Sequence, residues 1–223
     1  MNHPKAIVHL DRLARNYKIL SNSVNGKRLM AVVKANAYGH GAIECSKILE
    51  DQGCDIFSVF TVEEAKELRN AGLKSDILIL SKLEKESIQT AIDNDLIVNI
   101  SSIDDLDSII FYLEKNGLSP RFHMKIETGM NRLGFDIGDI SLAIGKLLDY
   151  KNLNCEGIYT HYATSDEGDL SYAHLQQERF EQALEIANEM GYTFKYNHIS
   201  NSGGLLNELS SNTNLLRLGI LLY

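Results

Sequence analysis

Proline, cysteine and tryptophan are scarce in this 223-residue chain, which contains two prolines, three cysteines and no tryptophan. With only Pro4 and Pro120 there is no proline-rich linker, and no composition shift marks a domain boundary. Cys45, Cys54 and Cys155 are odd in number and have no C-x-x-C spacing. We therefore expect neither a disulfide framework nor a metal site.

Long apolar runs and excess positive charge are also missing. No apolar run reaches the roughly 18 residues of a membrane-spanning helix, and the N-terminus lacks the apolar segment of a signal peptide. Thirty acidic residues against 22 basic ones give a net charge of −8, which excludes the basic surface typical of proteins that bind nucleic acid or anionic membranes. We expect a cytoplasmic protein with neither kind of partner.

What is present is a regular alternation of short apolar segments and amphipathic segments. The apolar segments predict eight strands at 29–34, 55–60, 76–80, 96–100, 121–127, 155–161, 193–200 and 215–219. The amphipathic segments predict helices at 12–25, 42–52, 62–71, 84–94, 103–116, 138–150, 171–190 and 203–210. A further short strand is expected at 6–10, with Asp11 capping the first helix and Gly26 ending it.

Strict alternation of strand and helix favours an all-parallel sheet, because parallel strands need crossover connections. Eight strands in one domain of this size predict an α/β fold, a closed (β/α)8 TIM barrel spanning residues 1–223. An open doubly wound sheet is the alternative. Against it, no G-x-G-x-x-G or G-x-x-x-x-G-K-[ST] follows the first full strand.

The most informative segment is Val33-Lys-Ala-Asn-Ala-Tyr-Gly-His-Gly41. A lysine at the carboxyl end of a buried strand is poorly hydrated, which lowers the pKa of its amine. Such an amine can form a Schiff base with a carbonyl, including the aldehyde of pyridoxal 5′-phosphate (PLP). Taken alone, Lys34 is more simply explained as a strand-end lysine that extends its amine to solvent.

Other polar residues fall at the expected carboxyl ends of strands, where (β/α)8 barrels place their functional groups. They are Lys125, Arg132, His161, Arg217 and the segment Asn201-Ser-Gly-Gly204. Each has a purely structural explanation, such as an ion pair, a buried hydrogen-bonded histidine or a tight turn. Their expected position on one rim of the barrel favours a shared functional site.

PLP chemistry offers a role for several of these residues. Asn201 and Ser202 open a short helix, and a helix N-terminus with free N–H groups suits a phosphate. Gly219 and Ile220 follow the eighth strand, where barrels often bind phosphate. Beside the pyridine nitrogen, the permanently protonated Arg217 would keep that nitrogen unprotonated and make the cofactor a weaker electron sink. This would suit an enzyme that moves only one α-proton.

Three segments resemble the alanine racemase family: 33–41, Met124-Lys-Ile-Glu-Thr-Gly-Met-Asn-Arg-Leu-Gly134 and Thr160-His-Tyr-Ala-Thr164. The resemblance implies that Lys34 holds PLP covalently and that Tyr38 reaches its phosphate. It further implies that Arg132 contacts the phenolic oxygen and the substrate carboxylate, positioned by a Lys125 that can be carbamylated. The resemblance also implies that His161 hydrogen-bonds Arg217, and that residues 198–202 and 217–220 surround the phosphate and the pyridine ring. Asn131 departs from the pattern, because many members have glycine there.

The family resemblance implies an isomerase that interconverts L-alanine and D-alanine, supplies D-alanine for peptidoglycan and works as a homodimer. Its two bases would be Lys34 and a tyrosine of a C-terminal β domain that is absent from residues 1–223. On that basis the chain alone is expected to be inactive. Three alternatives stay open: a racemase of another small amino acid such as serine, a non-catalytic PLP-binding barrel, and a cofactor-free Schiff-base aldolase. The aldolase would have no use for Arg217 and His161 as a pyridine-binding pair.

Overall fold

The computed structural model describes residues 6–24, 26–209 and 213–223. Its eight strands are parallel and form one sheet in the order β7-β6-β5-β4-β3-β2-β1-β8. They are β1 (Arg28–Val32), β2 (Ile56–Val59), β3 (Asp76–Lys82), β4 (Ile97–Ile100), β5 (Arg121–Lys125), β6 (Asn154–Tyr159), β7 (Tyr196–His198) and β8 (Leu215–Leu218). The predicted (β/α)8 barrel is confirmed, and the open doubly wound sheet is excluded.

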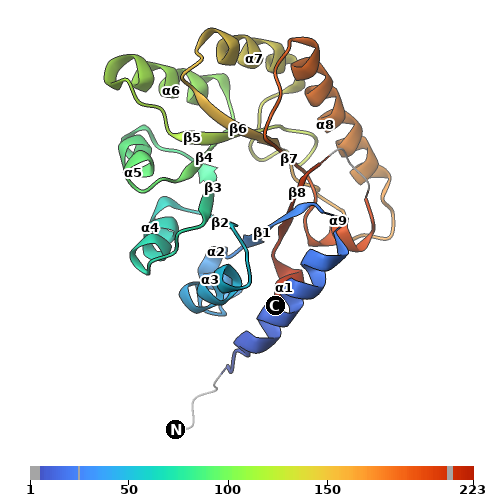
Figure 1. Cartoon of the computed structure of the whole chain (residues 1–223). Coiled ribbons are helices and arrows are strands. Elements are labelled where there is room, and N and C mark those ends of the chain that lie inside the picture. Colours follow the sequence, from blue (N-terminus) through green and yellow to red (C-terminus); the bar gives the residue numbers. More distant parts are fainter. Residues whose placement is uncertain (1–5, 25, 210–212) are drawn as a thin grey trace.

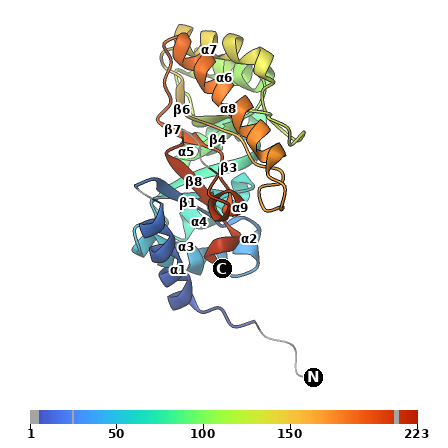
Figure 2. The same cartoon turned by 90° about the vertical axis from the view of Figure 1, so that its right-hand side faces the viewer.

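Backbone hydrogen bonds close the ring between β7 and β8. The Arg217 N–H donates to the Ser200 carbonyl at 3.0 Å, and the Asn214 N–H donates to the Asn197 carbonyl at 3.1 Å. Figure 1 looks into the barrel and shows the helices outside the ring of strands, and Figure 2 shows the same two layers from the side.

The α-helices are α1 (Leu10–Ser23), α2 (Lys34–Tyr38), α3 (Ala42–Asp51), α4 (Val62–Asn70), α5 (Ile88–Asp93), α6 (Ile103–Asn116), α7 (Ile140–Asp149), α8 (Ser171–Glu189) and α9 (Ser202–Leu206). Short 3₁₀ turns occur at η1 (Lys85–Ser87), η2 (Ile137–Asp139) and η3 (Ile220–Leu222). In the described ranges, none of these helices combines the length and the apolarity that crossing a bilayer requires.

Alternate residues of each strand face the barrel interior and the helices. The helix-facing side is apolar and continuous with the buried faces of the helices. The interior has a lower apolar layer, made of Met30, Ile56, Leu78, Ile97, Tyr196 and Leu215. Above this layer, toward the carboxyl ends of the strands, the interior becomes polar, with buried His123, His198, Lys125 and Arg217.

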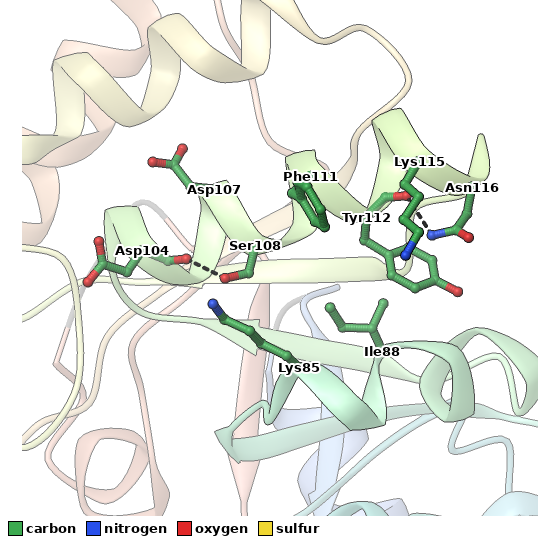
Figure 3. A pocket seen from close by; sticks show the side chains of 9 residues that line it. All are labelled: Lys85, Ile88, Asp104, Asp107, Ser108, Phe111, Tyr112, Lys115 and Asn116. Atoms are coloured by element: carbon green, nitrogen blue, oxygen red, sulfur yellow. Dashed lines mark hydrogen bonds between the residues drawn. The ribbon is translucent and has the colours of Figure 1, made fainter.

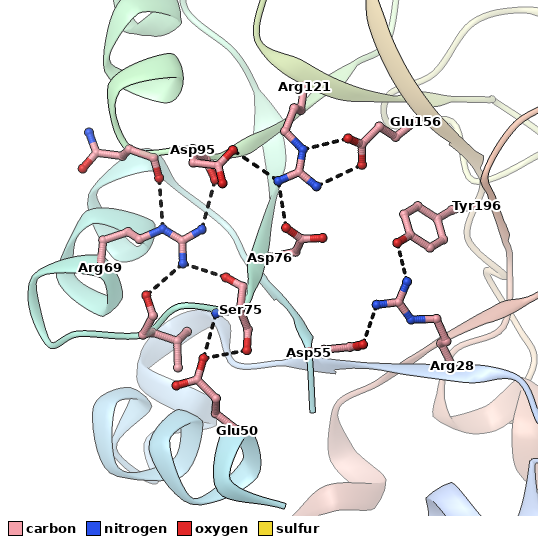
Figure 4. Close-up of polar contacts among 12 residues, drawn as sticks. Arg28, Glu50, Asp55, Arg69, Ser75, Asp76, Asp95, Arg121, Glu156 and Tyr196 are labelled. Atoms are coloured by element: carbon pink, nitrogen blue, oxygen red, sulfur yellow. Dashed lines mark hydrogen bonds and ion pairs between the residues drawn. The ribbon is translucent and has the colours of Figure 1, made fainter. Parts of the chain in front are cut away.

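Ion pairs cluster at the opposite end of the barrel, where the strands begin (Figure 4). Arg121 contacts Glu156 at 2.7 Å, Asp76 at 2.7 Å and Asp95 at 3.2 Å. Groups at this end of a (β/α)8 barrel serve stability rather than catalysis. Here they tie the start of β5 to those of β3 and β6.

The start of the chain differs from the prediction. Residues 6–9 form no strand, and α1 begins at Leu10 with His9 as its N-cap, so that Asp11 lies inside the first turn instead of capping it. An alternating pattern of five residues was too short to separate a strand from an extended helix entry. The helix ends at Ser23, and the predicted end positions Asn25 and Ser210 lie outside the described residues.

Strand ends were generally predicted too long. The expected strand at 193–200 is only Tyr196–His198, and Lys34 lies two residues beyond β1 instead of ending it. Lys125 is the last residue of β5, whereas the predicted strand continued to 127. These shifts place both lysines at the mouth of the barrel, where the backbone leaves the sheet.

Candidate functional site

A cavity of about 400 Å³ lies at the carboxyl ends of the strands. Its lining includes ten residues that were predicted for the site: Lys34, Tyr38, Lys125, Arg132, His161, Asn201, Ser202, Arg217, Gly219 and Ile220. Residues 198–200 and 218, which belong to the predicted phosphate and pyridine segments, are not among its lining residues. Phe60, Tyr159 and Asp166 complete much of the remaining wall. The strand ends of one barrel mouth therefore bring residues from all parts of the chain together.

A second hollow, of about 620 Å³, lies outside the barrel between α6 and the η1–α5 segment (Figure 3). Ser108 and Asn116 bond to carbonyls of their own helix, at 2.7 and 3.0 Å. Phe111 is 66% exposed there. Because this hollow is a surface groove without convergent buried polar groups, the barrel-mouth cavity is the better candidate.

Lys34 lies half-buried in the cavity wall. Its pKa is below the ordinary value of a lysine, because burial disfavours the charged amine and the nearby Arg132 and Arg217 repel it. Glu64 acts in the opposite direction. A larger fraction of this amine is thus unprotonated at neutral pH than in an exposed lysine, as a nucleophile requires.

The segment labelled α2 is not a regular α-helix, because the residues after Lys34 form a left-handed helical turn. Ala35, Asn36, Ala37 and Tyr38 have φ between 51° and 53°, a region that costs L-residues about 1–2 kcal/mol each. Gly39 and Gly41, which follow this turn, also have positive φ, but glycine adopts such values without strain. Strain of this kind is found where a functional group must be aimed.

Glu64 holds this turn in place. One oxygen of its carboxylate accepts the Ala35 N–H at 2.7 Å, and the other accepts the Phe60 N–H at 2.6 Å. The same side chain completes a capping box with Thr61 at the start of α4. The Asn36 side chain adds a second tie, since its oxygen accepts the Ala42 N–H at 2.8 Å.

Arg132 lies in the loop after β5, and Glu127 organises that loop. The Glu127 carboxylate accepts the backbone N–H groups of Gly129 and of Arg132. Burial would raise the pKa of Glu127, but hydrogen bonds from backbone N–H groups of residues 129–132 outweigh it and leave the pKa below its usual value. Asn131 has a φ of 52°, a backbone conformation that asparagine tolerates better than most residues other than glycine.

Lys125 is buried at the end of β5, with 6% of its surface exposed. Its pKa falls to about 8 because of burial and the nearby charges of Arg132 and Arg217. Its amine lies 5.7 Å from the centre of the Tyr159 ring. No carboxylate pairs with Lys125 among the described ion pairs. Lys125, Arg132 and Arg217 therefore give this part of the cavity an excess of positive charge.

Arg217, on β8, is buried and is held by neutral acceptors. Its guanidinium donates to the Thr160 carbonyl at 2.7 Å and to the Ile199 carbonyl at 3.1 Å. Its Nη2 also lies 3.1 Å from Nδ1 of His161, and its Nη1 lies 2.8 Å from Nδ1 of His198. Burial lowers the pKa of Arg217 to about 10, which still leaves it protonated at neutral pH.

His161 and Tyr159 lie close to this guanidinium. Burial and the charge of Arg217 hold the pKa of His161 well below its ordinary value, so the imidazole is neutral. The predicted hydrogen bond between His161 and Arg217 is therefore present, with the arginine as donor. Arg217 also lies 5.2 Å from the centre of the Tyr159 ring.

The other end of the cavity is built from small residues and hydroxyls. A Cβ at Gly219 would lie 2.5 Å from the Tyr38 hydroxyl, so glycine is needed for Tyr38 to occupy its position. The Ser202 hydroxyl lies 3.4 Å from the Gly219 nitrogen and 3.3 Å from the Leu221 nitrogen. The Asn201 side-chain oxygen is already used, because it accepts the Gly204 N–H at 2.9 Å and caps α9.

Several residues of the site were not predicted from the sequence. Glu64 and Glu127 hold the two loops, and His123 lies behind Arg217, where it contacts His198 of the predicted segment 198–202. Strand periodicity could have found His123, which precedes Lys125 by two residues and so faces the same interior. Glu64 gave a capping signal, three residues after Thr61, but nothing in the sequence tied it to Lys34.

Comparison with known proteins gives consistent results. A family model described as "Alanine racemase, N-terminal domain" matches residues 8–223. An alanine racemase of Methanococcus maripaludis is 37% identical over 226 residues, which cover all of this chain and 61% of that relative. The chain spans about three fifths of the length of the curated relatives that it matches.

Solved structures agree in fold. Alanine racemase from E. faecalis has a TM-score of 0.90 and 34% identity, over 97% of this chain and 58% of that one. Alanine racemase from Bacillus anthracis with bound L-Ala-P has a TM-score of 0.89 and 30% identity, over 99% of this chain and 59% of that one.

Proposed function

The chain belongs to the alanine racemase family, and from that premise we propose that it is the PLP-binding barrel of an enzyme that interconverts L-alanine and D-alanine. The observation that carries this proposal is the convergence of Lys34, Arg132, His161 and Arg217 on one cavity. In the same proposal, residues 1–223 form one barrel domain of a cytoplasmic homodimer, a C-terminal β domain lies beyond them, and the product D-alanine serves peptidoglycan synthesis.

The residues that line the cavity fit PLP. Lys34 offers an amine of lowered pKa, and Arg217 offers donors with no carboxylate among its described partners. The glycine at 219 lets the Tyr38 hydroxyl lie against the backbone near the Ser202 hydroxyl, and hydroxyl donors of this kind suit a phosphate. These three features match the aldehyde, the pyridine nitrogen and the phosphate of the cofactor.

In the proposed mechanism Lys34 would hold PLP, and its amine would act as the base on one face of the substrate. Bound PLP supplies the electron-withdrawing system that makes the substrate α-proton acidic. Arg217, a permanent donor, would hold the pyridine nitrogen of the cofactor by a hydrogen bond and keep it unprotonated, which would limit electron withdrawal and disfavour transamination. Arg132 orients the substrate carboxylate with its planar fork of donors.

A second acid–base group is needed on the other face, and the barrel's own tyrosines are poorly suited to it. Burial raises the pKa of Tyr38, Tyr159, Tyr162 and Tyr223 above that of a free tyrosine. A base with a raised pKa is harder to ionise at neutral pH. We therefore assign the second group to a tyrosine outside residues 1–223, so that this chain alone does not racemise alanine.

Borohydride fixation tests the proposal. The protein is incubated with PLP and reduced with borohydride, and the modified peptide is identified by mass spectrometry. We expect a stable adduct on Lys34 that is lost in Lys34→Ala and kept in Lys125→Met, the matched control that removes the other cavity amine. Full adduct yield in Lys34→Ala would refute the assignment.

A non-catalytic PLP barrel and a serine racemase remain the alternatives to alanine specificity. A barrel that only carries PLP would fix the cofactor but give no α-hydrogen exchange with any amino acid. A serine racemase would exchange serine in preference to alanine, so comparison of the two substrates separates these functions.

A further inference from the structure

Two histidines continue the polar chain from Arg217 into the barrel interior. His198 on β7 meets Arg217 Nη1 through its Nδ1 at 2.8 Å, and its Nε2 lies 2.9 Å from Nδ1 of His123 on β5. Both rings are fully buried. Tyr159 stacks on His198 with ring centres 4.7 Å apart and planes only 2° from parallel. Arg217, His198 and His123 thus form a linear hydrogen-bonded chain, which we call the file, that runs from the cavity toward the barrel centre.

The direction of every hydrogen bond in this file follows from arginine chemistry. A guanidinium can only donate, so Nδ1 of His198 must be an acceptor without a proton. A neutral His198 then carries its proton on Nε2 and donates it to Nδ1 of His123. His123 must in turn carry its proton on Nε2. Burial and the nearby charge of Arg217 keep both imidazoles neutral, because each has a pKa far below its ordinary value.

Two features of this arrangement distinguish it from an ordinary apolar barrel interior. The Nε2 of His123 is buried and has no hydrogen-bond partner among the described residues, which is unfavourable for a donor. Gly157 on β6 also accommodates the ring, because a Cβ there would lie 2.9 Å from three His123 ring atoms. Barrel interiors are usually filled by branched aliphatic side chains, which would show neither feature.

We propose that His123 is a positioning residue for Arg217: by accepting the His198 Nε2–H, it locks His198 in the tautomer that presents a bare nitrogen to the guanidinium. This inference rests on the proposed function, in which Arg217 faces the pyridine nitrogen of PLP. A neutral acceptor holds the guanidinium without forming an ion pair, so the full positive charge remains directed at the cavity. A carboxylate in the same place would neutralise that charge.

The first test needs no cofactor. In protein labelled with ¹⁵N, the ring nitrogens of His123 and His198 are assigned by NMR at neutral pH. We expect both rings to be neutral with the proton on Nε2, and the Arg217 N–H protons to exchange slowly with water. A charged ring, or a proton on Nδ1 of either histidine, overturns the proposal.

The second test separates positioning from packing. In His123→Phe the acceptor is lost, and we expect a mixture of tautomers at His198 and about tenfold faster exchange of the Arg217 N–H protons. His123→Asn restores an acceptor near the position of Nδ1 and should return both signals toward wild type. Failure of His123→Phe to change either signal in a folded protein contradicts the proposal.

Gly157→Ala displaces the His123 ring sterically without removing a polar group, and it should reproduce the His123→Phe effects. Its control is Gly145→Ala on α7, where a Cβ meets no atom within 4 Å. If His123→Phe and Gly157→Ala do not fold, the tautomers of the wild-type protein still decide the question.

Failure of the positioning role of His123 can be distinguished from failure of the proposed function. If PLP is not fixed by Lys34 but the tautomers are as expected, the proposed function fails, and the role of His123 is then limited to holding the guanidinium. If PLP is fixed and the tautomers differ, the proposed function stands and the positioning role of His123 is wrong. With ¹⁵N-labelled PLP, the pyridine signal should shift in His123→Phe and not in His123→Asn.

Discussion

Glu64 on α4 accepts the backbone N–H of Ala35 at 2.7 Å and so fastens the residue that follows Lys34 to the start of a neighbouring helix. The carboxylate thereby anchors a left-handed turn whose backbone conformation is unfavourable for residues other than glycine. Its negative charge also partly offsets the effect of burial and of Arg132 on the Lys34 amine. One side chain therefore influences both the position and the titration of the nucleophile.

Opposite changes in the Lys34 titration are expected from these two neighbours. Glu64→Gln keeps an acceptor for the Ala35 N–H but removes the charge that raises the pKa of Lys34, so the amine should titrate at lower pH. Arg132→Met removes a charge that lowers this pKa, so the amine should titrate at higher pH. The measurement is the rate of borohydride-trapped PLP attachment as a function of pH. Shifts of the same sign in both variants would contradict the assignment of these charges.

The fold was largely predictable from the sequence, because hydrophobic periodicity reports directly on burial. The helix at 103–116 was predicted with both ends correct, and in the structure Ser102 is its N-cap and Gly117 its C-cap. The strand at 6–10 was wrong, because four extended residues before a helix look like the start of a strand. The (β/α)8 barrel followed from the repeated alternation and did not depend on such local errors.

The site was predictable as a set of residues but not as a geometry. Strand-end positions identified Lys34, Lys125 and Arg217, since parallel strands direct their ends to one rim. Nothing in a glycine-free Ala-Asn-Ala-Tyr string indicated four consecutive left-handed residues. Nor could sequence reveal that the His123 ring fills the space beside Gly157, because such a contact joins two strands 34 residues apart and depends on their register.

A carbamate on Lys125 is the second expectation. Carbon dioxide reacts only with the neutral amine, and the pKa of about 8 makes this form available near neutral pH. The modification would replace a repelling charge beside Arg132 with an attracting one. With ¹³C-labelled bicarbonate, a carbamate carbon signal should appear in the protein and in Lys34→Ala but not in Lys125→Ala. A bare Lys125 ammonium in a well-resolved map, with Arg132 still in place, would count against it.

Reaction specificity should depend on the charge of Arg217. In the active enzyme that contains this barrel, Arg217→Glu would place a carboxylate beside the proposed position of the pyridine nitrogen. A proton on that nitrogen would then be stabilised. We expect slower racemisation and more transamination, measured as pyruvate formed per turnover. Arg217→Lys is the matched control, since it keeps a positive charge and should keep the partitioning low. Unchanged rates and partitioning in Arg217→Glu would remove this role.

Stability should depend on the ionic cluster at the other end of the barrel. Arg121 bridges three carboxylates and is mostly buried, so Arg121→Ala should reduce the free energy of unfolding by about 2–4 kcal/mol. Lys146→Ala, which breaks one partly exposed pair, should cost less than about 1 kcal/mol. Denaturant titration gives both values, and PLP attachment to Lys34 should be unchanged in each folded variant.

Acidification provides a second readout of the same cluster. Burial alone would raise the pKa of Asp76, but hydrogen bonding and charge attraction from Arg121 outweigh it and hold the pKa below its ordinary value. A carboxyl whose folded-state pKa is depressed contributes stability above its unfolded pKa of about 4 and loses it as the pH falls through the folded value. Asp76→Asn should therefore show a smaller loss of stability below about pH 4 than wild type. An equal or steeper loss would exclude Asp76 from the acid response.

Hydrogen exchange at the substrate α-carbon tests the central claim, that Lys34 is the base on one face and that the opposite base is not among residues 1–223. The 223-residue chain is loaded with PLP and incubated in deuterated water with D-alanine or with L-alanine, and deuterium incorporation and configuration are both measured. The account predicts slow exchange of D-alanine with its configuration retained, much less exchange of L-alanine, and net racemisation near background. Efficient interconversion of the two enantiomers by this chain would contradict it, because the second acid–base group would then lie inside the barrel.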